Sequence, residues 1–201
     1  MSEQPSTESQ CDERISDEQY AILEQLVGIP SAYTQEGPDG NESKIQHLIH
    51  NILDRERDVS VEVQPVGPES EDRFNIIAYK GAPLGEAEFT LMMYVHDDTV
   101  GKEEDWEGEI DFKLVRDGKV LRGIGVHDMK AGVMTLIHLL QHAKVPKEVT
   151  FIGLFGVGEE VDSDGMKRFM ESAEMREIRK HLDMVLSPEI NSLTEDGGDM
   201  P

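Results

Sequence analysis

Imidazole and carboxylate side chains follow apolar stretches of this sequence, each at the point where the stretch ends. The stretches 89–95, 149–157 and 183–187 have the composition of strands, and the middle one is almost continuously apolar. The side chains that follow them are His96, Asp98, Glu159, Glu160 and Glu189. One imidazole with several carboxylates and no thiolate suits Zn²⁺, Mn²⁺ or Co²⁺. Carboxylates can also bridge two metal ions about 3.5–4 Å apart, a common arrangement in hydrolases.

Each cluster alone has a plainer interpretation. A His-x-Asp sequence after a strand is usually a polar cap on a loop, and a Glu-Glu pair is usually solvated surface. Parallel strands, however, bring their carboxyl ends to the same edge of a sheet, where sites form in α/β proteins. Three clusters in this position favour a shared site over coincidence.

The spacing of His96 and Asp98 suggests different roles for the two residues. In an extended chain, residues two apart point to the same side, so Asp98 can accept the second imidazole N–H of His96 and fix its tautomer. Asp97, between them, is expected to point away and to be solvated.

A fourth cluster lies in the glycine-containing loop GIGVHDMK (123–130), just before an expected helix at 130–143. Asp128 either joins the shared site or caps that helix, and the sequence alone favours neither. The neighbouring His127 is left undecided, because adjacent residues often face apart.

Two further histidine pairs are not predicted to bind metal. His138 and His142 have the i, i+4 spacing of two zinc ligands, but their sequence is HLLQH, with Leu139 where a zincin would carry its catalytic glutamate. They are interpreted as solvent-facing helix residues. His47 and His50 are likewise expected on the surface of a second helix.

Strands alternating with helices predict an α/β fold with a central mixed, largely parallel twisted sheet flanked by helices. The first helix has a clear beginning, since Ser16 and Gln19 have the spacing of a capping box, and Gly28 ends its apolar periodicity. Strands are expected at 61–66 and 74–80. A hairpin is expected from 111–115 and 119–121.

Composition excludes several classes of partner. The 201 residues include 42 acidic and 19 basic ones, a net charge of −23, which argues against binding nucleic acid or anionic membranes. No apolar run reaches the roughly 18–20 residues that span a bilayer. The polar N-terminus does not resemble a signal peptide, and Cys11 is the single cysteine. We therefore expect a cytoplasmic protein.

Taken together, these motifs resemble the di-zinc metallopeptidase family of acetylornithine deacetylase, succinyl-diaminopimelate desuccinylase, aminoacylase and carboxypeptidase G. The similarity runs from about Ser16 to Glu189. The segments that carry it are LEQLVGIPSAYT, FNIIAYKG, VHDDTV, EEDWEG, LRGIGVHDMKAGV and GVGEEVDSDGM. Departures include Val95 for a family glycine, Ile124 for an arginine and Gly158 for an aspartate.

The resemblance implies a role for each residue. His96 would bind the first metal, with Asp98 behind it, and Asp128 would bridge two zinc ions, for which Co²⁺ or Mn²⁺ could substitute. Glu159 would be the general base, Glu160 would bind the second metal, and Glu189 the first. The family also tends to have a cis peptide after the bridging aspartate, here Asp128–Met129.

Family members are much longer than this chain. They carry a lid or dimerisation domain and a later histidine ligand, so the resemblance implies a truncated catalytic domain whose second metal site is incomplete. The expected organisation is a disordered acidic segment at 1–14, a partial metallopeptidase domain at 15–190 and a tail at 191–201. No lid domain is expected.

The implied activity is hydrolysis of an amide bond in a small N-acyl amino acid or short peptide, with little activity from the chain alone. Alternatives are a non-catalytic remnant, a subunit completed by a second chain, or a simple acidic cation-binding protein. Exposed apolar sheet surface would promote self-association or binding of a complementing C-terminal chain.

Overall fold

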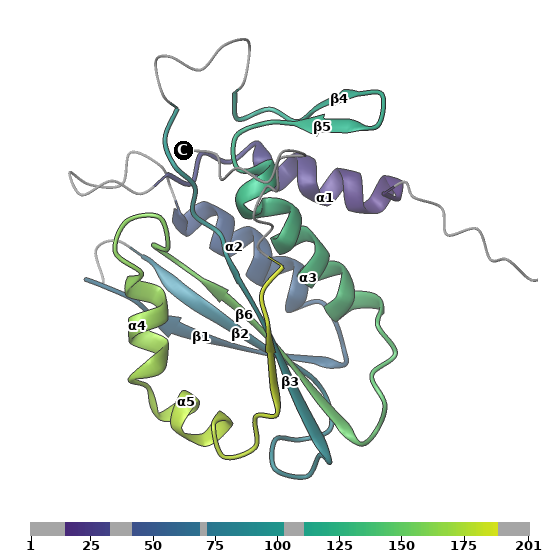
Figure 1. Ribbon diagram of the computed structural model, residues 1–201, viewed down its shortest axis with the longest axis vertical. Helices are drawn as coiled ribbons and strands as arrows, with labels where there is room; N and C mark the ends of the chain where they lie inside the picture. Colours follow the sequence, from purple (N-terminus) through teal and green to yellow (C-terminus); the bar gives the residue numbers. More distant parts are fainter. Residues whose placement is uncertain (1–14, 33–41, 69–71, 103–110, 189–201) are drawn as a thin grey trace, which may run out of the picture.

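The computed structural model describes residues 15–32, 42–68, 72–102 and 111–188. The expectations for the segments 1–14 and 191–201, and for Glu189, lie outside this range. A five-stranded sheet forms the centre, with strand order β1-β2-β6-β3-β7 (Figure 1). Its strands are β1 (Val59–Pro65), β2 (Phe74–Gly81), β3 (Phe89–His96), β6 (Val149–Gly156) and β7 (Met184–Leu186).

The sheet is mixed, which confirms the predicted fold class. β3 runs parallel to both β6 and β7, whereas β2 is antiparallel to β1 and to β6. Every residue of β6 after Val149 is buried, as expected for a nearly continuous apolar strand in the middle of a sheet. The clusters at His96 and Glu159 therefore lie at the carboxyl ends of strands in the parallel part of the sheet.

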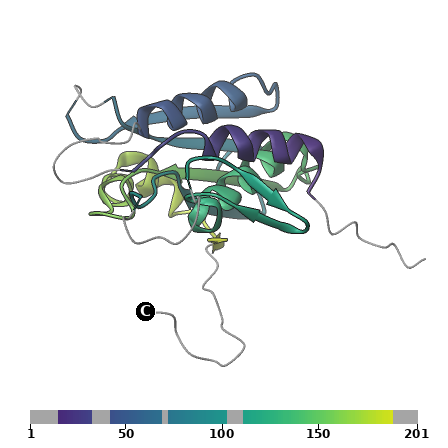
Figure 2. The ribbon, with the colours of Figure 1, turned by 90° about the horizontal axis from the view of Figure 1, so that it is seen from above.

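Helices cover both faces of the sheet. The helices are α1 (Asp17–Val27), α2 (Glu42–Leu53), α3 (Ala131–His142), α4 (Asp164–Met170) and α5 (Ala173–Ile178). The first three share one core with side chains such as Ile76 and Val95, and the last two share another with Ile77 and Met92. Ile76 and Ile77 belong to opposite cores because successive strand residues point to opposite faces. Figure 2 shows α2 and α4 on opposite sides of the strands.

The first helix begins and ends where the sequence predicted. Ser16 accepts a hydrogen bond from the backbone N–H of Gln19, and the Gln19 side chain accepts one from the Ser16 N–H, which completes the capping box. Gly28 is the C-cap. The amphipathic pattern that suggested the helix buries Leu23, Leu26 and Val27.

The predicted hairpin is shorter than expected and its turn is shifted. The strands are β4 (Val115–Asp117) and β5 (Val120–Arg122), and the segment 111–113 is not a strand. The turn centres on Gly118 and Lys119, because Gly118 takes the left-handed conformation, with φ +60°, that a tight hairpin turn requires.

The last described strand, β7, is exposed. It pairs only with β3 among the described strands, and Met184, Val185 and Leu186 are 47%, 51% and 46% exposed. None of the described helices is long and apolar enough to cross a bilayer.

Candidate metal centre

The candidate site forms where β3 and β6 end side by side. His96 is the last residue of β3 and lies opposite Gly156, the last residue of β6. The Asp97 N–H extends this pairing by donating to the Gly156 carbonyl at 3.0 Å. The residues that follow the two strands, Asp98 and Glu159, therefore start from the same edge.

Asp128 reaches this edge from a different element. It lies in η2 (Val126–Lys130), a turn of π-helix interrupted by non-helical backbone at Asp128 and Met129, which leads into α3. The Asp128–Met129 peptide is cis, as the family resemblance implied. Met129 is buried, and its sulfur accepts a hydrogen bond from the His96 N–H at 3.3 Å. This contact holds the turn against the end of β3.

The side chains converge on the His96 imidazole. Its Nε2 lies 3.0 Å from Asp128 Oδ1 and 4.0 Å from Glu159 Oε2. Candidate ligand atoms of His96, Glu159 and Glu160 all lie within 4.8 Å of one another. His96 is 1% exposed, whereas the Asp128 and Glu159 side chains are 50% and 38% exposed. A buried imidazole thus faces half-exposed carboxylates that solvent, and a substrate, can reach. We call His96, Asp128, Glu159 and Glu160 the strand-end cluster.

Asp98 lies behind His96 and joins the two strand ends. His96 Nδ1 is 3.2 Å from the Asp98 backbone oxygen and 3.4 Å from its carboxylate Oδ1. The fully buried carboxylate also accepts the backbone N–H groups of Glu159 and Glu160, each at 3.0 Å. Asp98 therefore orients both His96 and the backbone that carries the two glutamates. The sequence suggested the first contact but gave no sign of the second.

Asp97 was predicted to be solvated, and this was wrong. Its carboxylate is fully buried, with Gln46 Nε2 3.5 Å from its Oδ1, and it lies close to the carboxylates of Glu42 and Asp98. Burial, together with the nearby carboxylates of Glu42 and Asp98, raises the pKa of Asp97 well above its ordinary value. The expectation failed because α2, distant in sequence, covers this side of the loop.

The loops of the site are tied to the segment that follows α1. The Ser31 hydroxyl donates to the Asp97 carbonyl at 2.8 Å, and the Ser31 backbone carbonyl accepts a hydrogen bond from the Thr99 N–H at 3.3 Å. The buried Lys130 ammonium donates to the Ile29 carbonyl at 2.7 Å, and burial lowers the pKa of Lys130 to about 8. The Ile-Pro-Ser turn thus fixes both the loop after β3 and the turn that carries Asp128.

A buried ion pair supports the loop after β6. Glu42 pairs with Arg73, both almost completely buried, and also accepts the Gly158 N–H at 2.9 Å. Gly158 directly precedes the two glutamates of the cluster, so this contact fixes their starting point. The role of Glu42 was not predicted, because nothing in the sequence around it distinguishes a buried carboxylate from a solvated one.

The strand-end cluster carries more negative than positive groups. Burial disfavours the charged form of His96, but the carboxylates of Asp98, Asp128 and Glu159 outweigh it and raise the pKa of His96 to about 9. Burial, then the charge of Asp128, raises the pKa of Glu160 to about 7. Carboxylates crowded together in this way favour a bound cation.

The donor set fits a zinc-type ion. Zinc is frequently bound by carboxylates and by an imidazole whose second nitrogen faces a carboxyl or carbonyl group. The second imidazole nitrogen of His96 faces both such groups of Asp98. The geometry places Asp128 beside His96 Nε2, the nitrogen directed away from Asp98. Glu189, the remaining expected ligand, lies outside the described residues.

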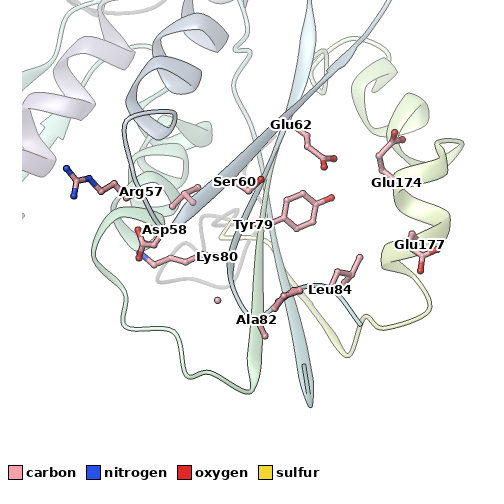
Figure 3. A pocket seen from close by; sticks show the side chains of 13 residues that line it. Arg57, Asp58, Ser60, Glu62, Tyr79, Lys80, Ala82, Leu84, Glu174 and Glu177 are labelled. Carbon is pink, nitrogen blue, oxygen red and sulfur yellow. The ribbon is translucent and has the colours of Figure 1, made fainter. Parts of the chain in front are cut away.

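One cavity, of about 590 Å³, lies elsewhere in the molecule (Figure 3). It is bordered by Tyr79, Lys80 and Glu174, and Tyr79 pairs with Ile152 in the first half of β6. The cavity is thus at the amino-terminal end of β6, opposite to the strand-end cluster, and we assign it no part in the chemistry.

The other histidines have separate environments. His127 is exposed, and His47 lies on the surface with its Nε2 2.9 Å from Asp72 Oδ2. His142 is exposed as expected, but His138 is half-buried and its ring contacts that of His142. None of these side chains belongs to the strand-end cluster.

Comparison with known proteins decides the family. Residues 92–197, more than half of the chain, match the model of peptidase family M20/M25/M40. The chain belongs to this family. The matched residues include every member of the strand-end cluster, and the resemblance seen in the sequence is thereby confirmed.

Relatives within the M20/M25/M40 family have several names. The chain is 32% identical over 150 residues to a probable carboxypeptidase of Talaromyces marneffei, covering 68% of this chain and 32% of that protein. It is 31% identical over 121 residues to acetylornithine deacetylase of Proteus mirabilis, covering 60% of this chain and 30% of that protein. The structure of human carnosine dipeptidase 1 has a similar fold, with TM-score 0.73 at 19% identity, covering 88% of this chain and 39% of that one. The chain thus spans about a third of the length of these relatives.

Proposed function

We propose that the strand-end cluster is the catalytic metal centre of a hydrolase that cleaves C–N bonds in amides or peptides. The observation that carries this proposal is the convergence of His96 Nε2 with Asp128, Glu159 and Glu160 at the ends of β3 and β6. Membership in a peptidase family supports the reaction class. The assignment of individual roles rests on the geometry and the family resemblance together.

Zinc is the proposed metal, with Co²⁺ or Mn²⁺ as substitutes. His96 and Asp128 would hold the first ion, together with Glu189, and Asp128 and Glu160 would hold a second. When bound, zinc lowers the pKa of water and polarises a carbonyl group. With only Asp128 and Glu160 assigned to it, the second site is the weaker of the two.

Glu159 is the proposed general base. Its side chain is half-exposed and its Oε2 lies 4.0 Å from His96 Nε2, so it borders the space in front of the imidazole. There it would accept a proton from the attacking water and return it to the leaving amine nitrogen. Asp98 is a positioning residue, because it holds His96 and the backbone of Glu159 without facing that space.

The proposed substrate is a small N-acyl amino acid or a short peptide. The names of the relatives support this class, since they include a probable carboxypeptidase and an acetylornithine deacetylase. The exposure of Asp128 is compatible with an open site that admits such a substrate from solvent. The choice between deacylase and peptidase is left to the assay below.

Metal analysis combined with an activity panel tests the proposal. The purified chain should bind zinc more tightly than calcium and, with zinc or cobalt, hydrolyse at least one member of a panel of N-acyl amino acids and dipeptides. A rival proposal, an acidic cation-binding protein without catalysis, expects no preference for zinc over calcium. Equal affinities for the two ions with no turnover would favour that rival.

Zinc binding should also release protons. At pH 7 His96, with a pKa of about 9, is protonated and Glu160, with a pKa of about 7, is half protonated. Because a ligand must lose its proton to bind, we expect about 1–1.5 protons to be released per chain. Calorimetry in buffers of different ionisation enthalpy measures this number. Glu160→Gln should lower it by about half a proton, and release near zero in the parent chain would refute the assignment.

Partners and location stay predictions. Self-association, or a complementing chain, is expected at apolar surface such as the exposed edge strand β7. Light scattering on the pure protein tests this expectation. A cytoplasmic location is expected from the sequence.

A further inference from the structure

A second group of metal-ligating side chains lies on the helical layer. It consists of Glu18, His138 and His142, whose candidate ligand atoms all lie within 4.8 Å of one another. None of the three belongs to the strand-end cluster. We propose that this helix-pair cluster is a separate binding site for a first-row divalent transition ion, with Zn²⁺ as the best fit.

The two histidines come from the last turns of α3. Residues four apart lie on the same face of a helix, so His138 and His142 can approach one ion together. Their ring centroids are 4.5 Å apart, with the ring planes inclined at 51°. This pair was not predicted to bind metal because it lacks the glutamate of a zincin, but a binding site does not need a catalytic base.

The third ligand comes from another helix. Glu18 lies in the first turn of α1, which packs against α3 (Figure 1). Its Oε2 is 3.3 Å from His142 Nε2. The carboxylate is therefore already placed beside one imidazole, and a bound ion would cross-link the two helices. No pattern in the sequence could have joined Glu18 to residues 120 positions away.

His138 supplies an independent indication of a missing partner. Its Nδ1 is buried, yet no group in the described part of the chain forms a hydrogen bond with it. A buried polar atom without a partner is destabilising. Coordination of an ion through Nδ1 would supply the missing interaction.

The ligand chemistry selects the class of ion. Two imidazoles and one carboxylate suit zinc, nickel, cobalt or copper, whereas calcium and magnesium prefer sites made wholly of oxygen. The Glu18 and His142 side chains are 54% and 47% exposed, so an ion can enter from solvent. The plainer interpretation is an exposed His142–Glu18 ion pair, which needs neither His138 nor a metal.

This site lies away from the strand-end cluster. Lys130, just before α3, is bonded to Ile29, just after α1, so these helix ends face the strand-end cluster. Glu18 and His142 lie at the opposite ends of the same helices, about 16 Å away along the helix axes. An ion there would hold together the two helices whose other ends support Asp128 and the Ile-Pro-Ser turn.

Calorimetric titration of ZnCl₂ into the whole chain tests the proposal. His142→Gln and His138→Gln should each remove one equivalent of bound zinc or weaken it at least tenfold, and Glu18→Gln should weaken the same equivalent. The matched control is His181→Gln, because His181 also lies near a glutamate, Glu177, at 3.6 Å but has no place in any ligand group of the described residues. The control should bind as the parent chain does.

A second measurement separates the two sites. In an Asp128→Asn background, which disables the strand-end cluster, zinc should still raise the Tm, and adding His142→Gln should abolish the rise. Any change in Tm that calcium causes should be the same in the Asp128→Asn variant with and without His142→Gln, because calcium prefers sites made wholly of oxygen. Unchanged zinc stoichiometry and affinity in His138→Gln and His142→Gln would overturn the proposal, whether or not the strand-end cluster binds zinc.

Discussion

His96→Ala is expected to lower the zinc affinity of the strand-end cluster by more than about a hundredfold. Loss of a partner behind a ligand typically costs 10–100-fold in metal affinity, so loss of the ligand itself should cost more. His96 is the imidazole on which Asp128, Glu159 and Glu160 converge, and these carboxylates would be left around a void. Competition titration with a chromophoric chelator measures the change.

His127→Ala is the matched control for this experiment. His127 is adjacent to Asp128 but exposed, and it has no place in a ligand group of the described residues. It should therefore bind zinc within about twofold of the parent chain. If His127→Ala lost zinc and His96→Ala kept it, the imidazole ligand would be misassigned. Circular dichroism of both variants checks that the sheet is intact, since His96 is buried.

Glu159→Gln is expected to reduce hydrolysis by about 10²–10⁴-fold while zinc content stays unchanged. The amide cannot accept the proton of the attacking water, but the volume and the backbone contact of Glu159 with Asp98 are preserved. Glu160→Gln, its neighbour, should instead lose the second equivalent of zinc, because Glu160 is the proposed ligand. The two variants make the same chemical change one position apart, so each is a control for the other.

The zinc content of the Glu159→Gln and Glu160→Gln variants tests their assigned roles without any measurement of turnover. Metal content by atomic emission, measured after dialysis against limiting zinc, distinguishes base from ligand even where hydrolysis is slow. Loss of zinc from Glu159→Gln but not from Glu160→Gln would show that the two assignments are exchanged. Full activity of Glu159→Gln would rule it out as the base.

The parts of the fold that depend on local pattern were predictable. The capping box at Ser16, the apolar strand β6 and the helix α3 were each expected within about two residues of their observed bounds. Strand-end placement of His96 and the glutamates followed from the same patterns. These features depend on periodicity and on residues close in sequence, which a single sequence displays directly.

Contacts between distant segments were not predictable. The burial of Asp97 depends on α2, and the support of Gly158 depends on Glu42, more than a hundred residues earlier. The pairing of Glu18 with His142 depends on how α1 lies along α3. In each case a polar residue that would ordinarily be solvated is covered or joined by an element whose position only the tertiary structure gives.

The most direct test of the central claim is anomalous diffraction at the zinc edge, from crystals of this chain grown with zinc. The strand-end cluster predicts a strong peak about 2.0–2.2 Å from both His96 Nε2 and a carboxylate oxygen of Asp128. A well-occupied zinc peak elsewhere, for example at the Glu18–His138–His142 cluster, with no density beside His96 would contradict the assignment of the catalytic centre.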